Sequence, residues 1–150
     1  AIILLSFGLL GVAGMQVKTQ QFNRAAYFET QAIFIAHDML ERMRSNVAGQ
    51  ESGYYHLPTP TKHDSCYTTA SCSTLEMAQN DLYEWKGVGV DSISTKLPSG
   101  AGVVCLDSTP DDGTPKSPKC DNTGGIYAVK VWWQASEDET RRAITTAAFK

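Results

Sequence analysis

Hydrophobic and polar positions divide the first third of the chain into two helical patterns. Residues 1–17 carry no charge, and Lys18 is the first charged side chain. Residues 16–47 contain neither proline nor glycine and are rich in good helix formers. Apolar residues then recur three and four positions apart, which marks one face of a helix. We therefore expect one helix from the start of the chain to about Val47, apolar all round at first and amphipathic afterwards. Its amphipathic part has the apolar positions Phe28, Ala32, Ile35, Ala36, Met39, Met43 and Val47.

Local signals mark the end of this helix. Asp38 and Arg42 are four residues apart, and we expect them to form an ion pair on its surface. The helix should stop between Asn46 and Gly49, where Gly49 supplies a left-handed C-terminal turn.

The charge-free start of the chain is compatible with a cleaved signal peptide, a membrane anchor or a helix buried in a soluble core. Residues 1–17 are at the lower edge of a membrane span, which needs about 20 apolar residues. A signal peptide has basic residues before its apolar run and does not continue as a helix into the mature domain. Glycines such as Gly8, Gly11 and Gly14 are common in membrane helices. We therefore expect a membrane helix and, because the chain does not begin with Met, further residues upstream.

A second, shorter helix is predicted in the middle of the chain. Ser73 and Glu76 have the spacing of a capping box, in which each side chain accepts a hydrogen bond from the other residue's backbone. The apolar positions that follow form one helical face, and Gly87 ends the helix. Asp91 is expected to cap a short helical turn that ends at Leu97, before a proline. The predicted apolar face consists of Leu75, Ala78, Leu82 and Trp85.

Three strands are predicted after this helix. Residues 101–106 form a short apolar run, residues 126–133 alternate, and residues 142–149 are rich in β-formers, with 136–140 as a hairpin connection. Residues 108–125 are rich in Pro, Asp, Gly and Ser and predict a surface loop. In the alternating strand, Trp132 and Trp133 point to opposite faces, so we expect one of them to be exposed. The resulting architecture is α+β, with the amphipathic half of the long helix lying across a small antiparallel sheet.

Composition limits the partners and the compartment. The net charge is −3, and no basic face is evident, so we expect no nucleic-acid partner. An even number of cysteines beside a membrane-targeting segment favours two disulfides in an oxidising compartment, the alternative being four free buried thiols. Of the three possible pairings, we prefer the one that closes the shortest loops. It joins Cys66 to Cys72 and Cys105 to Cys120.

The sequence offers no convincing catalytic or metal-binding set. His37 is expected to be partly buried on the long helix, and His56 and His63 are interpreted as solvated loop residues. A solvated acidic loop is preferred to a calcium site for the aspartates after residue 106, because the ligand spacing of such a site is absent. No hydrolase, zinc-protease or nucleotide-binding motif is present, so we expect neither an enzyme nor a cofactor. These aspartates are Asp107, Asp111, Asp112 and Asp121.

Four segments together resemble one family. "ILLSFGLLGVAGMQ" followed by "AAYFETQAIFIAHDMLERMRSNVAG" is similar to the N-terminal helix of PilV-type minor pilins, the type IV pilus modification proteins. "MAQNDLYEWKGVGVDSISTKLPSGAGVVC" and "YAVKVWWQ" resemble the second half of that family. The mature chains of the family begin with a methylated aromatic residue and carry a glutamate shortly after it. Neither matches a residue here, so we expect this sequence to start about ten residues late.

The resemblance implies a type IV pilin-like fold and a function without chemistry. Residues 1–17 would be a truncated membrane and filament-core segment, residues 18–48 the amphipathic part of the same helix, and residues 49–150 a periplasmic domain. Such a protein resides in the inner membrane before assembly and at the cell surface in the pilus afterwards. Its implied partners are other minor pilins, the major pilin and a tip adhesin, with which it primes assembly and lies at the pilus tip. The residues expected to pack in the membrane and filament are Ile3, Leu4, Leu5, Phe7, Gly8, Leu9, Leu10, Gly11 and Gly14. The expected partner contacts are Trp132, Trp133, Asp111 and Asp112.

Other functions share parts of this pattern. A minor pseudopilin of a type II secretion system has the same architecture but belongs to a short filament that expels folded proteins. A membrane-anchored periplasmic enzyme or binding module would require a ligand site, and the sequence offers none that is convincing. Genomic neighbours would separate the pilus from the secretion system.

Overall fold

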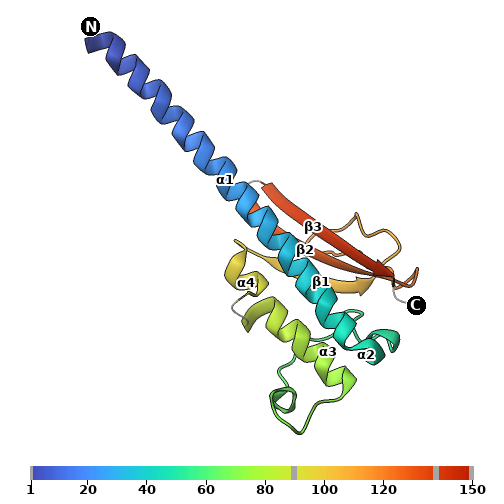
Figure 1. Ribbon diagram of the computed structural model, residues 1–150. Helices are drawn as coiled ribbons and strands as arrows, with labels where there is room; N and C mark the ends of the chain where they lie inside the picture. Colours follow the sequence, from blue (N-terminus) through green and yellow to red (C-terminus); the bar gives the residue numbers. More distant parts are fainter. Residues whose placement is uncertain (1, 89–90, 137–138, 149–150) are drawn as a thin grey trace.

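A long helix dominates the architecture of the computed structural model (Figure 1). The structure describes the backbone of residues 2–88, 91–136 and 139–148, and the side chains of residues 14–87, 91–135 and 139–147. Helix α1 (Ile2–Ser45) has 44 residues and is therefore about 66 Å long. Its N-terminal half projects beyond the rest of the molecule, and its C-terminal half lies across the sheet. The α+β class and the position of the helix are confirmed.

The end of α1 is set by Asn46 and not by a left-handed glycine. Asn46 leaves the helical conformation and caps the short helix α2 (Val47–Glu51), its side chain accepting a hydrogen bond from the Gly49 N–H at 3.2 Å. Gly49 lies inside α2, so its predicted role in a left-handed turn is wrong. A glycine is required there because a Cβ atom would lie 2.4 Å from the Asn46 side chain. Val47, predicted to be buried, is exposed.

A disulfide-closed loop leads into the second, shorter helix that the sequence predicts. A 3₁₀ turn, η1 (Asp64–Tyr67), contains Cys66, which is bonded to Cys72. Helix α3 (Thr74–Tyr83) then begins with the predicted capping box of Ser73 and Glu76. Leu75 lies outside the buried face of α3 and is exposed, contrary to its predicted position.

The connection from α3 to the sheet is irregular. Helix α3 continues as a π-helical turn, η2 (Glu84–Val88), and a short helix, α4 (Ile93–Lys96), follows. Ser92 occupies the N-cap position of α4 that was predicted for Asp91. Asp91 instead forms an ion pair of 3.0 Å with Lys96 at the other end of this helix.

The three predicted strands form one antiparallel sheet. Strands β1 (Ala101–Leu106), β2 (Ile126–Ser136) and β3 (Glu139–Ala148) are adjacent in that order. Strand β2 is central, with Val104 opposite Val129 on one side and Thr145 opposite Val129 on the other. The predicted alternation along β2 is confirmed, since one set of its side chains faces the helix and the other faces away.

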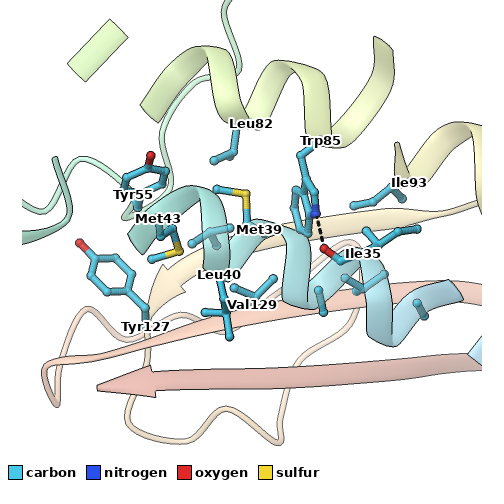
Figure 2. Close-up of a cluster of buried hydrophobic side chains, with 14 of the residues drawn as sticks. Ile35, Met39, Leu40, Met43, Tyr55, Leu82, Trp85, Ile93, Tyr127 and Val129 are labelled. Atoms are coloured by element: carbon cyan, nitrogen blue, oxygen red, sulfur yellow. Dashed lines mark hydrogen bonds between the residues drawn. The ribbon is translucent and has the colours of Figure 1, made fainter. Parts of the chain in front are cut away.

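The main core lies between the sheet, α1 and the α3–α4 layer (Figure 2). Met39 and Met43 of α1 pack between the sheet and α3, and Trp85 closes one end of the core. Burial of each such side chain stabilises the fold by about 1.5–3 kcal/mol. The predicted inward positions of α1 are therefore confirmed, with Phe28 only partly buried. Those that are fully buried are Ala32, Ile35, Ala36, Met39 and Met43.

The second face of the sheet is covered by the loop between β1 and β2. This loop is connected to β1 by the Cys105–Cys120 disulfide, the second of the two predicted pairs. Val103, Cys105 and Trp132 form a small apolar cluster beneath it. Residues 108–125 therefore form the predicted loop and also cover part of the hydrophobic interior.

Candidate assembly interface

Some of the exposed apolar side chains of α1 lie in a row along the helix. Met15, Phe22 and Ile33 are 75%, 72% and 47% exposed. With Ala26 between them, they are spaced by seven, four and seven residues, which is the repeat of a helix–helix packing seam. A row of this kind on a helix that projects from its domain is a candidate surface for a second helix.

Two threonines near this row form hydrogen bonds within the helix. The Thr19 hydroxyl donates a hydrogen bond of 3.0 Å to the Met15 carbonyl, and the Thr30 hydroxyl donates one of 2.9 Å to the Ala26 carbonyl. These hydroxyls therefore have little need for water, which lowers the cost of covering them with a partner. His37, which was predicted to be partly buried, is exposed farther along α1.

A hollow lies where α1 leaves the globular domain. Its volume is about 610 Å³, and it opens between α1 and the loop and strand ends beside it. Arg24 stands at this hollow with its guanidinium 5.7 Å from the centre of the Phe28 ring. Its described lining consists of Gln21, Arg24, Ala25, Phe28, Pro98, Gln134 and Ala135. The hollow thus combines amide and guanidinium donors with apolar walls.

Neither tryptophan of β2 is exposed, which corrects the prediction of one exposed indole. Trp133 is 2% exposed in the main core, and Trp132 is 3% exposed beneath the loop. The sequence pattern was correct in separating them to two faces, but the disulfide-closed loop covers the second face. In the isolated chain these two residues therefore have no surface to offer a partner.

The acidic residues of this loop hold it in place. Lys130, fully buried on β2, lies 2.5 Å from Asp107 and 3.3 Å from Asp112 through its Nζ. The same Nζ donates to the carbonyls of Asp112 and Pro118 at 3.1 and 2.9 Å. Asp107 is therefore buried and paired, not solvated as predicted.

The remaining two aspartates of the loop occupy different surroundings. Asp121 accepts hydrogen bonds from the side chains of Ser108 and Thr123 and from their backbone N–H groups, and these bonds keep its pKa well below the ordinary value. Asp111 keeps an exposed side chain, while its carbonyl accepts a hydrogen bond from Arg142. Of the predicted contact residues, Asp111 is thus exposed, Asp112 is partly buried and both tryptophans are buried.

The geometry gives no support for metal binding in the described part of the chain. His56 accepts a hydrogen bond of 3.0 Å from the Leu106 N–H at the edge of β1, and His63 is 2.8 Å from Gln79 through its ring. These histidines therefore hold loops to the domain and are not free solvated side chains. The nearest approach to a ligand cluster in the described residues contains Cys105, Asp107 and Cys120. Both of its sulfurs belong to a disulfide, and its carboxylate is paired with Lys130.

A polar network connects the C-terminal half of α1 to α3. Arg42 donates hydrogen bonds of 2.8 Å to Asp38, in the predicted pair, and to Glu84. Its guanidinium is also 3.7 Å from Asp81, which accepts a hydrogen bond of 2.5 Å from the Tyr55 hydroxyl. Burial raises the pKa of Asp81 above its ordinary value, and the contacts with Tyr55 and Arg42 only partly oppose this effect. The network thus contains a carboxylate whose charge is poorly solvated.

A family model for type IV pilins of the Tt1218-like group matches residues 14–83. Over these residues the chain is type IV pilin-like. No curated protein and no solved structure shows a significant match to it.

The matched part of this pilin-like chain contains the exposed row of α1. It runs from Gly14 through α2 and the first disulfide to the end of α3, so it includes Met15, Phe22 and Ile33. The sheet and its disulfide-closed loop lie outside the match. The type IV pilin resemblance is thereby confirmed, while nothing in the match distinguishes a minor pilin from other pilins.

The predicted membrane and filament segment is less fully described. Side chains of the predicted packing residues from Ile3 to Gly11 lie outside the described residues, and Gly14 is exposed on α1. Among the residues that are described, no helix provides an apolar stretch long enough to cross a membrane.

Sequence reasoning missed the exposed row on α1. An amphipathic helix is expected to have one apolar stripe, so only the positions that face the sheet were predicted to matter. The signal was nevertheless present, since Met15, Phe22 and Ile33 are large apolar residues on the side opposite the charged pair of Asp38 and Arg42.

Proposed function

We propose that this pilin-like chain is a minor subunit of a type IV pilus that takes part in priming assembly and lies at the pilus tip. It acts by protein–protein contacts without catalysis. The observation that carries the proposal is the exposed row of Met15, Phe22 and Ile33 on a helix that projects from its domain. Water-exposed apolar side chains on such a helix are stabilised when neighbouring helices cover them.

The charge-free start of α1 supports residence in the inner membrane before assembly. Residues 1–17 would anchor the chain, residues 18–48 would pack on the domain and on neighbours, and residues 49–150 would lie in the periplasm. Small residues such as Gly8, Gly11 and Gly14 permit close helix approach in a filament. The two disulfides fit an oxidising compartment.

The loop over the sheet is proposed to select partners. Rigidly held loops commonly carry specificity, and this loop is fixed by the Cys105–Cys120 bond and by Lys130. Asp111 offers an exposed charge on it. Other minor pilins, the major pilin and a tip adhesin are the proposed partners.

The test is co-purification from membranes. The full chain is co-expressed with the minor pilins and the major pilin encoded beside it, extracted in mild detergent and isolated by affinity chromatography. We expect a stoichiometric complex that Phe22→Asp weakens at least tenfold. Leu75→Asp is the matched control, because it places the same charge on an exposed apolar residue of α3 and should leave the complex intact.

Two outcomes would change the proposal. A complex formed only with pseudopilins of a secretion system would replace the pilus with the secretion system as the site of action. Recovery of the chain alone, with equal behaviour of both variants, would exclude the exposed row of α1 as an assembly surface.

A further inference from the structure

Two cations stand on α1 between its charge-free start and the globular domain. Lys18 and Arg24 are the first charged residues of the chain, and the first acidic residue is Glu29. Both basic side chains are exposed, and no described carboxylate lies within ion-pair distance of either. The Arg24 guanidinium lies over the Phe28 ring, 5.7 Å from its centre. The positive charge at this level of the helix is therefore available to an external anion.

The hollow beside Arg24 has the chemistry of a site for an amphipathic ligand. Polar donors come from Gln21 and Arg24, while Ala25, Phe28 and Pro98 provide apolar walls. A ligand that fits this lining is anionic at one end and apolar at the other. A free inorganic anion would leave the apolar walls unused.

The order of apolar and basic residues along α1 places these groups at the surface of a bilayer. Lys18 and Arg24 follow the charge-free residues 1–17, and long basic side chains at the end of an apolar helical segment reach toward the headgroups. The two residues are about 9 Å apart along the helix axis. Phe22 and Tyr27, 72% and 53% exposed, stand at the level where aromatic residues gather in membrane proteins.

We infer that Lys18, Arg24 and the hollow bind the headgroup phosphate of an anionic phospholipid when the chain resides in the membrane before assembly. The inference rests on the proposed membrane residence of the pilin-like subunit. Charge complementarity selects this occupant over a neighbouring helix, because the facing groups are cations and amide donors. Binding would hold α1 at a defined depth before the subunit enters a filament.

The experiment is flotation of the full chain with vesicles after removal of detergent. One set of vesicles contains phosphatidylcholine alone, and the other an equimolar mixture of phosphatidylcholine and phosphatidylglycerol. Each cation near an anionic surface contributes about fivefold in affinity, so we expect the mixture to bind about 25-fold more tightly. The double variant Lys18→Gln/Arg24→Gln should lose this preference and keep its binding to phosphatidylcholine.

A matched control separates the site from general positive charge. Arg44→Gln removes an exposed cation at the far end of α1, where it pairs with Glu41, and should leave the preference intact. Equal loss in both variants would overturn the site. Equal binding of the unmodified chain to both vesicles would also overturn it, while leaving membrane residence in place.

Two further outcomes count against the inference. Failure to bind either vesicle would overturn membrane residence and the headgroup site together. Self-association in phosphatidylcholine that the double variant abolishes would assign the two cations to a subunit contact instead. A photoreactive phosphatidylglycerol should crosslink to Gln21 or Phe28, and crosslinks confined to residues 1–17 would exclude the hollow.

Discussion

The indole Nε1 of Trp85 donates a hydrogen bond of 2.8 Å to the backbone carbonyl of Ile35, fifty residues earlier in the chain (Figure 2). Ile35 lies in α1, and its carbonyl oxygen has a second lone pair for this donor. Trp85 belongs to the π-helical turn η2, and its side chain is 1% exposed. This bond therefore joins the long helix to the α3–α4 layer at the end of the core.

Replacing Trp85 with Phe tests the value of that bond. Trp133→Phe is a matched control, because it removes the same atoms from a buried indole whose Nε1 has no hydrogen-bond partner in the described structure. We expect Trp85→Phe to lower the free energy of unfolding by about 1–2 kcal/mol more than Trp133→Phe. Urea denaturation followed by circular dichroism measures both values. Equal losses would show that the hydrogen bond contributes nothing beyond packing.

Local patterns were sufficient to predict much of this fold. The alternation in β2 and the capping box of Ser73 and Glu76 depend on residues close in sequence, and both were predicted correctly. The pairing Cys105–Cys120 followed from loop length alone. Such features can be predicted because their physical causes act over one strand or one helical turn.

Features that depend on distant residues were not predictable in this way. Trp132 is buried because a loop folds back over β2, and Asp107 is buried because Lys130 reaches it from that strand. Neither the burial of Trp132 nor that of Asp107 can be recognised from the residues adjacent in sequence. The π-helical turn that aims Trp85 at α1 and the crossing of Arg42 to Glu84 likewise depend on tertiary packing.

The two disulfides should differ in their contribution to stability. Cys105 and Cys120 are 15 residues apart, whereas Cys66 and Cys72 are 6 apart. In the chain-entropy model the longer loop is worth about 3 kcal/mol and the shorter about 2 kcal/mol. We expect Cys105→Ala/Cys120→Ala to lower the melting temperature more than Cys66→Ala/Cys72→Ala, with thiol counting to confirm the oxidised pair in each. The opposite order would contradict this assignment.

The buried pair of Lys130 and Asp107 should behave as a unit. Lys130→Met leaves the Asp107 carboxylate buried without its cation, which we expect to cost about 3–5 kcal/mol in unfolding free energy. The double variant Lys130→Met/Asp107→Leu should recover most of this loss, because it removes both charges. Lys116→Met, an exposed lysine of the same loop, should have little effect. A double variant no more stable than Lys130→Met would exclude the uncompensated charge as the cause.

The raised pKa of Asp81 predicts how stability depends on pH. Because burial raises this pKa in the folded chain, the folded state holds the Asp81 proton more tightly than the unfolded state does. The contribution of Asp81 is therefore greatest below its ordinary pKa of 3.8 and is lost as pH rises through the higher folded value. Asp81→Asn removes this dependence, so the stability of the variant relative to the unmodified chain should increase between pH 4 and pH 7.

Urea denaturation at several pH values measures the difference, with Glu84→Gln as the contrasting variant. Burial alone would raise the Glu84 pKa, but hydrogen bonds from Tyr67 and Arg42 outweigh it and leave this pKa below its ordinary value of 4.5. The stability of Glu84→Gln relative to the unmodified chain should therefore decrease as pH rises toward 4.5 and stay constant above it. A difference for Asp81→Asn that is constant with pH would contradict the raised pKa.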